Sequence, residues 1–348
     1  MLVVDMISPA GHLALNEFVV GALRKLDGSG VCGVFKRSYQ SLNDGEDSNF
    51  CYFPEFKLLR IGGVGDEQGW RHYLMILFFM FFLFFSRPFF NTYRNDKKVL
   101  FLSYNPLSHL ALFAVLKVFG FDIYCFEHNS IPSKRSRFFN VKSFFFSACS
   151  KFVVHLVFED YISDYLRNEY RTKVLVIPHP CLASPRVGDY YTQKSSLLSF
   201  FSPSGSTKNS FITRLETYAD EIGAKLYIKS TSYSSRRVDT IVSKYFENYM
   251  ELMGRVDCVM IGCDFDYRVS GVFYEALAAK TKILMSDCVF ARNVGDKYPN
   301  VFVFNHDTFA DVIRACKEQD ITDYYNVEAH NKIIETKLSL ILDGKVVR

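Results

Sequence analysis

The stretch Arg268-Val-Ser-Gly-Val-Phe-Tyr-Glu-Ala-Leu-Ala-Ala-Lys-Thr-Lys-Ile-Leu-Met-Ser-Asp287 carries most of the information about the fold. It predicts a polar loop, a short helix that begins near Ser270 and Gly271, and a buried strand at 282–285. Glu275 is the one carboxylate in this otherwise apolar helix. Such a unit can present a helix N-terminus and one acid to an anionic, hydroxyl-rich ligand, whereas the alternative is an amphipathic crossover helix whose glutamate faces water.

Strand-length apolar runs alternate with helical patterns along the whole chain, which is typical of βαβ units and a parallel sheet. In the first half the expected strands are 1–6, 31–35, 99–103, 122–126, 152–157 and 173–178. The expected helices between them include 13–25, 107–119 and 160–170. In the second half the expected strands are 197–202, 225–229, 258–262, 282–285 and 301–304, and the expected helices are 210–221, 245–253, 271–279 and 308–318.

The 348 residues favour two domains. Pro178, Pro180 and Pro185, followed by a polar stretch to Ser196, are typical of a linker. We therefore expect an α/β protein with two Rossmann-like, doubly wound domains, 1–188 and 196–326, that face a cleft. A helix at 327–342, within the C-terminal segment 327–348, would return to the first domain. Ligands of such folds bind at the carboxyl ends of the strands.

Composition limits the function classes. Hydrophobic residues make up 49% of the chain and charged residues 22%, which is typical of a globular protein. A net charge of +4 is too small to indicate nucleic acid as a partner. The nine cysteines form no CxxC pair and no zinc-type spacing, and the first residues lack a basic signal region, so a reducing cytoplasm is expected.

The segment Tyr73–Phe85 (YLMILFFMFFLFF) is continuously apolar, but Ser86-Arg87-Pro88 ends it. It falls short of the roughly 18–20 residues that span a bilayer. A buried helix is one interpretation. Flanking basic residues, and a second basic and aromatic stretch at 133–146, instead favour a surface that contacts anionic lipid, on the inner face of the membrane.

Several polar residues follow the expected strands and are candidates for binding or catalysis. Gly11 would let the backbone approach a phosphate or sugar and so bind the donor, and His12 could act as a base or a hydrogen-bond donor, although a turn with a solvated histidine has the same sequence. His128 lies at the carboxyl end of an apolar strand, where it would either contact a ligand or cap the next turn. Lys208, in a loop rich in small residues, could neutralise a phosphate with Arg268, or both could be ordinary surface cations.

No metal site is expected. Asp264-Phe-Asp266 matches DxD in letters, but two-letter matches arise often by chance, and these residues lie beside the helix start expected to bind phosphate. No GxSxG motif or Cys/His arrangement supports hydrolase chemistry.

Taken in order, these positions resemble a GT-B glycosyltransferase, closest to the family-4-like group that acts on bacterial polysaccharides. The resemblance extends over most of the chain, from Gly11-His12 through His128 and Ile177-Pro178-His179 to the Lys208 loop. Its most specific part is 271–284, which is similar to the second half of the family's E-x7-E segment.

The resemblance implies a nucleotide-sugar donor as co-substrate, no other cofactor, and a lipid-linked or glycan acceptor. Glu275 would hold the donor ribose, and Lys208, Arg268, Ser270 and Gly271 would hold the diphosphate. His128 and His12 would contact the transferring sugar or the acceptor.

The sequence departs from the family at two places. Tyr267 occupies the position of the first glutamate, with Asp264 and Asp266 close by, and Ser202 occupies the position of an arginine. A catalytically inactive partner protein of a membrane assembly complex, and a nucleotide-sugar isomerase, are the alternatives.

Overall fold

The computed structural model describes residues 1–7, 13–36, 49–53, 70–182, 198–205, 207–262, 265–305, 307–321 and 325–345. The chain divides into two compact units, which we call unit 1 (Met1–Pro178 with Lys332–Arg348) and unit 2 (His179–Asn331). The linker that the sequence predicts after Pro185 lies outside the described residues.

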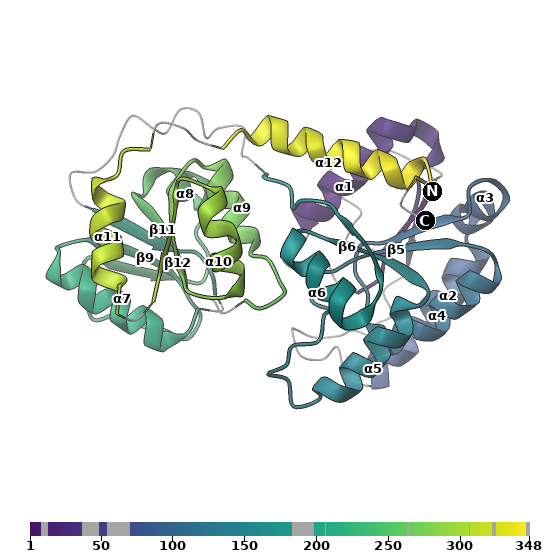
Figure 1. Ribbon diagram of the computed structural model, residues 1–348, viewed down its shortest axis with the longest axis horizontal. Coiled ribbons are helices and arrows are strands. Elements are labelled where there is room, and N and C mark those ends of the chain that lie inside the picture. The colour runs from purple at the N-terminus through teal and green to yellow at the C-terminus, as the bar shows by residue number, and fades with distance from the viewer. Residues whose placement is uncertain are drawn as a thin grey trace. The chain divides into compact units, whose positions relative to one another are not determined.

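Unit 1 is built on a parallel sheet of seven strands in the order β3-β2-β1-β4-β5-β6-β7 (Figure 1). The strands are β1 (Leu2–Asp5), β2 (Cys32–Lys36), β3 (Phe50–Phe53), β4 (Lys98–Phe101), β5 (Asp122–Phe126), β6 (Val153–Val157) and β7 (Lys173–Val176). β1 and β4 are neighbours although β2 and β3 separate them in sequence, so the chain reverses its direction of winding between these two strands. The sheet therefore has a topological switch point there.

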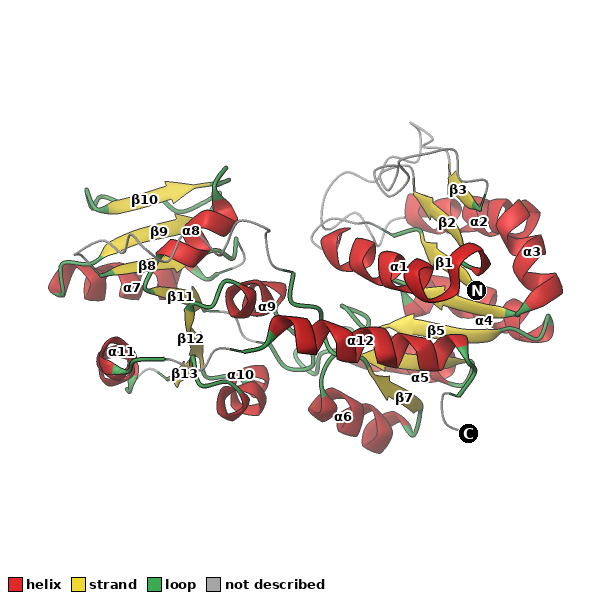
Figure 2. Cartoon of the chain, turned by 90° about the horizontal axis from the view of Figure 1, so that it is seen from above, coloured by secondary structure: helices red, strands yellow, loops and turns green. Residues whose placement is uncertain are grey.

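Helices cover both faces of this sheet. They are α1 (Leu13–Asp27), α2 (Trp70–Phe85), α3 (Arg87–Asn95), α4 (Pro106–Val118), α5 (Phe139–Ser150), α6 (Asp160–Tyr170) and, from the C-terminus, α12 (Val327–Leu342). Apolar residues of β1, β2, β4 and β5 form one core with α2, α4 and the start of α3. Figure 2 shows α1 and α12 on the opposite face.

Unit 2 contains a parallel six-stranded sheet in the order β10-β9-β8-β11-β12-β13. Its strands are β8 (Ser199–Ser202), β9 (Lys225–Lys229), β10 (Thr240–Ser243), β11 (Cys258–Ile261), β12 (Lys282–Ser286) and β13 (Val301–Phe304). Its helices are α7 (Asn209–Glu221), α8 (Tyr249–Arg255), α9 (Gly271–Ala278), α10 (Val289–Val294) and α11 (Phe309–Glu318). The switch point of this sheet lies between β8 and β11.

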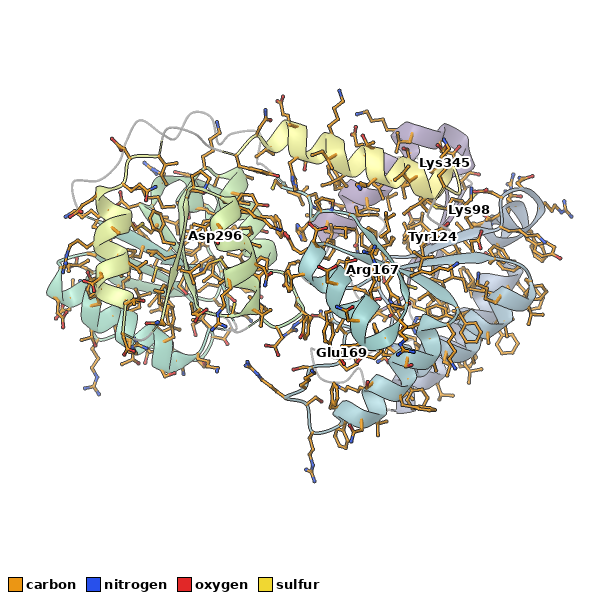
Figure 3. The ribbon with its side chains drawn as sticks, viewed as in Figure 1. Lys98, Tyr124, Arg167, Glu169, Asp296 and Lys345 are labelled. Atoms are coloured by element: carbon orange, nitrogen blue, oxygen red, sulfur yellow. The ribbon has the colours of Figure 1, made fainter. Side chains whose placement is uncertain are left out.

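The two parallel sheets confirm the predicted fold class of two Rossmann-like α/β domains. The second half of α12 lies on unit 1, as predicted, because Lys25 Nζ contacts the Glu335 carboxylate at 2.9 Å and Lys98 Nζ donates to the Leu342 carbonyl at 2.5 Å. Lys98 is labelled beside the end of α12 in Figure 3.

The elements β3, β10, α3, α5 and α10 were not predicted. β3 and β10 are strands of four residues at sheet edges, and the polar ends of β10 conceal its alternation. α3 begins directly after α2 because the Ser86 hydroxyl accepts a hydrogen bond from Phe89 N and Pro88 occupies its first turn, where a proline is tolerated.

Candidate functional site

The loops that follow β8 and β11 form the candidate site of unit 2, because they leave neighbouring strands at the switch point of the sheet. Parallel strands end at the same edge, and ligands of doubly wound sheets bind where the winding reverses. Ser202 ends β8 and Gly262 follows β11, and the two strands pair directly. Lys208, Arg268 and Ser270 therefore emerge at one edge of one sheet.

The loop after β8 places two buried hydroxyls before a cation. Ser202 Oγ and Thr207 Oγ1 are both buried, and neither makes a hydrogen bond to any described residue. Lys208 follows at the N-cap of α7, its side chain is exposed, and it has no ion pair within the described part of the chain. Buried hydroxyls are normally hydrogen-bonded, so this loop offers donors, together with one positive charge, at the start of a helix.

Gly262 lets α7 approach the end of β11. A Cβ atom at this position would lie 2.4 Å from Cδ1 of Phe211, a side chain in the first turn of α7. Any larger residue at position 262 would push Phe211, and with it the start of α7, away from the end of β11. The glycine thus brings the start of α7 close to the loop that carries Arg268.

The N-terminus of α9 completes this edge. Ser270 is buried at the N-cap position and its side chain makes no capping hydrogen bond, while Gly271 is exposed with open space around its Cα. The first amides of a helix have no partner within the helix and attract anions. Arg268 is exposed, and its guanidinium carbon lies 5.8 Å from the centre of the Phe265 ring.

Glu275, one turn further along α9, is half-buried and does not simply face water. Its Oε2 accepts a hydrogen bond of 2.7 Å from the Tyr249 hydroxyl at the start of α8. Burial, and then the charge of Glu275, raise the pKa of Tyr249 well above its ordinary value, so the phenol remains a donor. Oε1 makes no hydrogen bond to the described residues. Lys229 Nζ, at the end of β9, lies 5.4 Å from the centre of the Tyr249 ring.

Packing holds α9 in place. Phe273 packs edge-on against Phe290 and Tyr298, with ring centres 5.2 and 5.4 Å away. Tyr274 is buried and stacks on the ring of His179 at 4.4 Å. His179 therefore has a structural role in unit 2.

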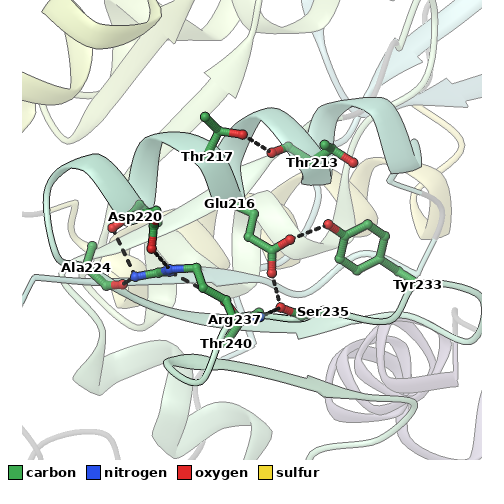
Figure 4. Close-up of polar contacts among 10 residues, drawn as sticks. Thr213, Glu216, Thr217, Asp220, Ala224, Tyr233, Ser235, Arg237 and Thr240 are labelled. Carbon is green, nitrogen blue, oxygen red and sulfur yellow. Dashed lines mark hydrogen bonds and ion pairs between the residues drawn. The ribbon is translucent and has the colours of Figure 1, made fainter.

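A polar network fixes the crossover between β9 and β10, which contains no helix (Figure 4). Glu216 of α7 accepts hydrogen bonds from Tyr233 at 2.6 Å and from Ser235. Arg237 binds Asp220 at 2.9 Å and the carbonyl of Ala224 at 2.7 Å. These hydrogen bonds tie the crossover to α7. The crossover begins where β9 ends, at Lys229, so its attachment also fixes that end of the strand.

The switch point of unit 1 is organised around Asp5, at the end of β1. This buried carboxylate accepts hydrogen bonds from Ile7 N and Asn16 Nδ2, both at 3.1 Å, and from the hydroxyl of Ser103 after β4. It therefore stabilises the start of the loop that leads to α1. Gly11 and His12, which the sequence predicts as site residues, belong to this loop but lie outside the described residues.

His128 follows β5, as predicted, and its ring lies 6.0 Å from that of Phe126 and 5.3 Å from that of Phe158. The preceding residue, Glu127, is buried and accepts hydrogen bonds from Tyr104 and His155. Glu127, Tyr249 and Lys229 were not predicted as site residues. Their positions at strand ends or a helix start were the available signal, but their partners come from distant segments.

A cavity of about 460 Å³ in unit 1 lies away from these residues. It is lined by Met1 and Cys32, at the amino ends of β1 and β2, and by Asp96, at the start of β4. This is the edge opposite to Asp5 and Glu127, so the cavity has no part in the candidate site. Within the described ranges no three His, Cys, Asp or Glu side chains come together to hold a metal ion.

No protein-family model and no curated protein matches the sequence. Solved structures share its fold. Sucrose-phosphate synthase from Thermosynechococcus elongatus superposes with a TM-score of 0.65 at 11% identity, over 99% of this chain and 94% of that chain. UDP-N-acetylglucosamine 2-epimerase from Rickettsia bellii gives 0.62 at 14% identity, over 99% and 96%. WaaG, a glycosyltransferase involved in lipopolysaccharide biosynthesis, gives 0.58 at 12% identity, over 99% and 95%.

These matches show that the chain has the fold of the GT-B glycosyltransferases, which confirms the predicted fold, while the family-4-like group stays a prediction. The epimerase among them shows that the same fold also occurs in an enzyme of another class. The residues of the site, and not the fold, therefore decide which of these activities the protein has.

Proposed function

We propose that this protein is a glycosyltransferase that moves a sugar from a nucleotide-diphosphate donor to a lipid-linked or polysaccharide acceptor in cell-surface glycan biosynthesis. The proposal rests on the groups at one edge of the sheet in unit 2. There the N-terminus of α9 and the unpaired Lys208 flank the switch point, and Glu275 keeps one carboxylate oxygen available. A diphosphate matches the cations and amides, and a ribose matches the carboxylate.

In this proposal the diphosphate binds to Lys208, Arg268 and the amides at Ser270 and Gly271. These groups stabilise the negative charge that develops on the departing nucleoside diphosphate, and the transfer needs no metal ion. His128 contacts the transferring hexose or the acceptor from unit 1, and we retain His12 in the same role.

The acceptor class is inferred from two observations. WaaG is a glycosyltransferase of lipopolysaccharide biosynthesis, and unit 1 exposes apolar side chains suited to a membrane. A cytoplasmic protein bound peripherally to the inner face of the membrane would reach a lipid-linked acceptor there.

Two other functions have specific support. Tyr267 in place of the family's first glutamate favours a catalytically inactive partner protein in a membrane assembly complex. The similarity to the epimerase favours a nucleotide-sugar isomerase. An isomerase acts on a soluble substrate, which would leave the apolar surface of unit 1 unexplained.

The test is to incubate the purified protein with a panel of sugar nucleotides and membrane extract and to follow the release of nucleoside diphosphate. Release that depends on the extract supports transfer. An altered sugar nucleotide without release would indicate an isomerase. Binding of nucleotide without either reaction would indicate the inactive partner, and no binding at all would refute the proposed site.

The membrane part of the proposal depends on what we call the apolar helical surface, the outward faces of α2, α4 and α5. α4 packs against both of the other helices, so the three faces are neighbours (Figure 1). The exposed apolar side chains on it are Leu74, Leu77, Phe78, Phe81, Phe85, Leu107, Val115, Val118, Val141 and Phe144. Large exposed apolar patches mark interaction sites.

Positive charge borders this surface. The segment 133–150, which contains α5, has four basic residues and no acidic one, and Arg135, Arg137 and Lys142 are exposed. Among the described residues no single helix is long and apolar enough to cross a bilayer. Two consecutive helices, Leu74–Phe85 and Arg87–Asn95, together have the length and apolar composition of a span, but the chain bends between them. Apolar side chains bordered by cations match an anionic lipid surface.

We expect the protein to float with vesicles of phosphatidylglycerol, to float less as salt rises, and to bind vesicles of phosphatidylcholine weakly. Replacing Phe81 and Phe85, which are 61% and 77% exposed, by serine should abolish flotation without lowering the melting temperature. The matched control is Val238→Ser, which removes a 96% exposed apolar residue from unit 2 and should float like the wild type. Equal flotation of all variants would refute this surface.

A further inference from the structure

A buried polar cluster around Glu127, the residue before His128, joins side chains from β6 and from the segments that follow β4 and β5. Glu127, directly after β5, is 2% exposed and accepts a hydrogen bond of 2.7 Å from Tyr104, which follows β4. It also accepts one from the hydroxyl of Ser130 in its own turn. His155 of β6 is completely buried, and its Nδ1 lies 2.5 Å from Glu127 Oε1.

The hydrogen bonds around His155 determine where its protons lie. The Ser150 hydroxyl donates to the carbonyl of Phe146 at 2.8 Å, so it accepts from His155 Nε2, which is also 2.8 Å away. Nδ1 faces the Glu127 carboxyl group, so one proton lies between these two groups. With that proton on Nδ1, His155 is an imidazolium paired with the Glu127 carboxylate.

Three other titratable groups lie near Glu127. Burial, and then the negative charge of Glu127, raise the pKa of the Cys149 thiol to about 12, and the same two causes raise the pKa values of Tyr104 and Cys125. These three groups therefore stay neutral. His155 is the one described group in contact with Glu127 that can carry a positive charge, and a buried carboxylate without such a partner would be strongly destabilising.

We propose that the Glu127–His155 ion pair is a positioning device for the adjacent His128. Tyr104, Ser130 and His155 hold the Glu127 carboxylate from three sides, and Glu127 N donates to the carbonyl of Leu156 at 2.9 Å. With both its backbone and its side chain held, Glu127 fixes the start of the turn that carries the next residue. The role in transfer depends on the proposed function, whereas the ion pair itself does not.

The test is Glu127→Gln, which keeps the shape of the side chain and removes its charge. We expect kcat to fall by about 10²-fold, as a small misplacement of a reacting group can produce. The KM for the donor should change by less than about twofold, because the donor residues belong to unit 2. ¹⁵N-resolved NMR of the imidazole groups near neutral pH should show both His155 nitrogens protonated in the wild type and one in the variant.

The matched control is Glu169→Gln, which neutralises a glutamate of the same unit whose side chain is 52% exposed (Figure 3). It should change neither kcat nor the His155 signals. If Glu127→Gln fails to fold, Ser150→Ala removes the hydrogen bonds of Ser150 to His155 and Phe146, leaves the contact between Glu127 and His155 in place, and should cause a smaller loss of kcat.

The outcomes separate the two proposals. A neutral His155 in the wild type would refute the ion pair, and an unchanged kcat in Glu127→Gln, with the His155 signals altered, would refute the positioning role. If the wild type releases no nucleoside diphosphate with any donor, the proposed function fails and the positioning role in transfer fails with it, while the NMR signals still decide whether the ion pair exists.

Discussion

Replacing Glu275 by alanine is expected to weaken binding of the donor nucleotide by about 10- to 100-fold. In the proposed site its carboxylate accepts hydrogen bonds from the ribose, and a hydrogen bond to a charged group contributes about 1.5–3 kcal/mol. Each 1.4 kcal/mol changes the affinity about tenfold. The fold should tolerate the change, because the helix is held by Phe273 and Tyr274 on its other side.

The measurement is the rise in melting temperature, or the heat of binding, as nucleoside diphosphate is added. Glu251→Ala is the matched control. Glu251 lies on α8, near Tyr249, but its carboxylate pairs with Arg255 at 2.5 Å in a partly exposed ion pair. It should leave binding unchanged, and equal effects of the two variants would show that the site is misplaced.

Tyr249→Phe separates two roles of Glu275. It removes the hydroxyl that holds Oε2 at 2.7 Å and leaves the ring in place. A weaker loss of affinity than in Glu275→Ala would show that Tyr249 orients the carboxylate, while no loss would show that the orientation comes from the helix alone.

The sequence predicted the helix of Glu275 well because its signals are local. Ser270 and Gly271 start the helix, the alanines allow close packing, and an apolar strand follows. The same holds for Asp122–Phe126 and Asp160–Tyr170, whose predicted bounds agree with the structure. Where a pattern repeats every two or about 3.6 residues, neighbours in sequence are sufficient to decide the element.

The partners of the site residues could not be predicted, because they are set by tertiary packing. Glu275 and Tyr249 are 26 residues apart, and Glu127 and His155 are 28 apart. The sequence pattern places Tyr249 only in a helix and Glu127 only at the end of a strand. Single-sequence patterns contain no information on which strand ends become neighbours.

The fold alone does not distinguish a transferase from an epimerase, and the departure at Tyr267 does not decide it either. What favours transfer is the combination of features in separate parts of the chain. Unit 2 has the cations and amides for a diphosphate, and unit 1 has a histidine at a strand end and an exposed apolar surface. Variants that separate binding from turnover therefore test the proposal most directly.

His128→Ala is expected to give the largest loss of turnover, about 10²- to 10⁴-fold in kcat, the range for loss of a group that transfers or shares a proton. Donor binding should be retained, since the proposed donor residues belong to the other unit. The nucleotide-induced rise in melting temperature should therefore equal that of the wild type. This is the reverse of Glu275→Ala, so each variant is the control for the other. If His128→Ala retains turnover, the histidine only packs against Phe126 and Phe158, and the acid–base or sugar-binding group must be sought elsewhere in unit 1.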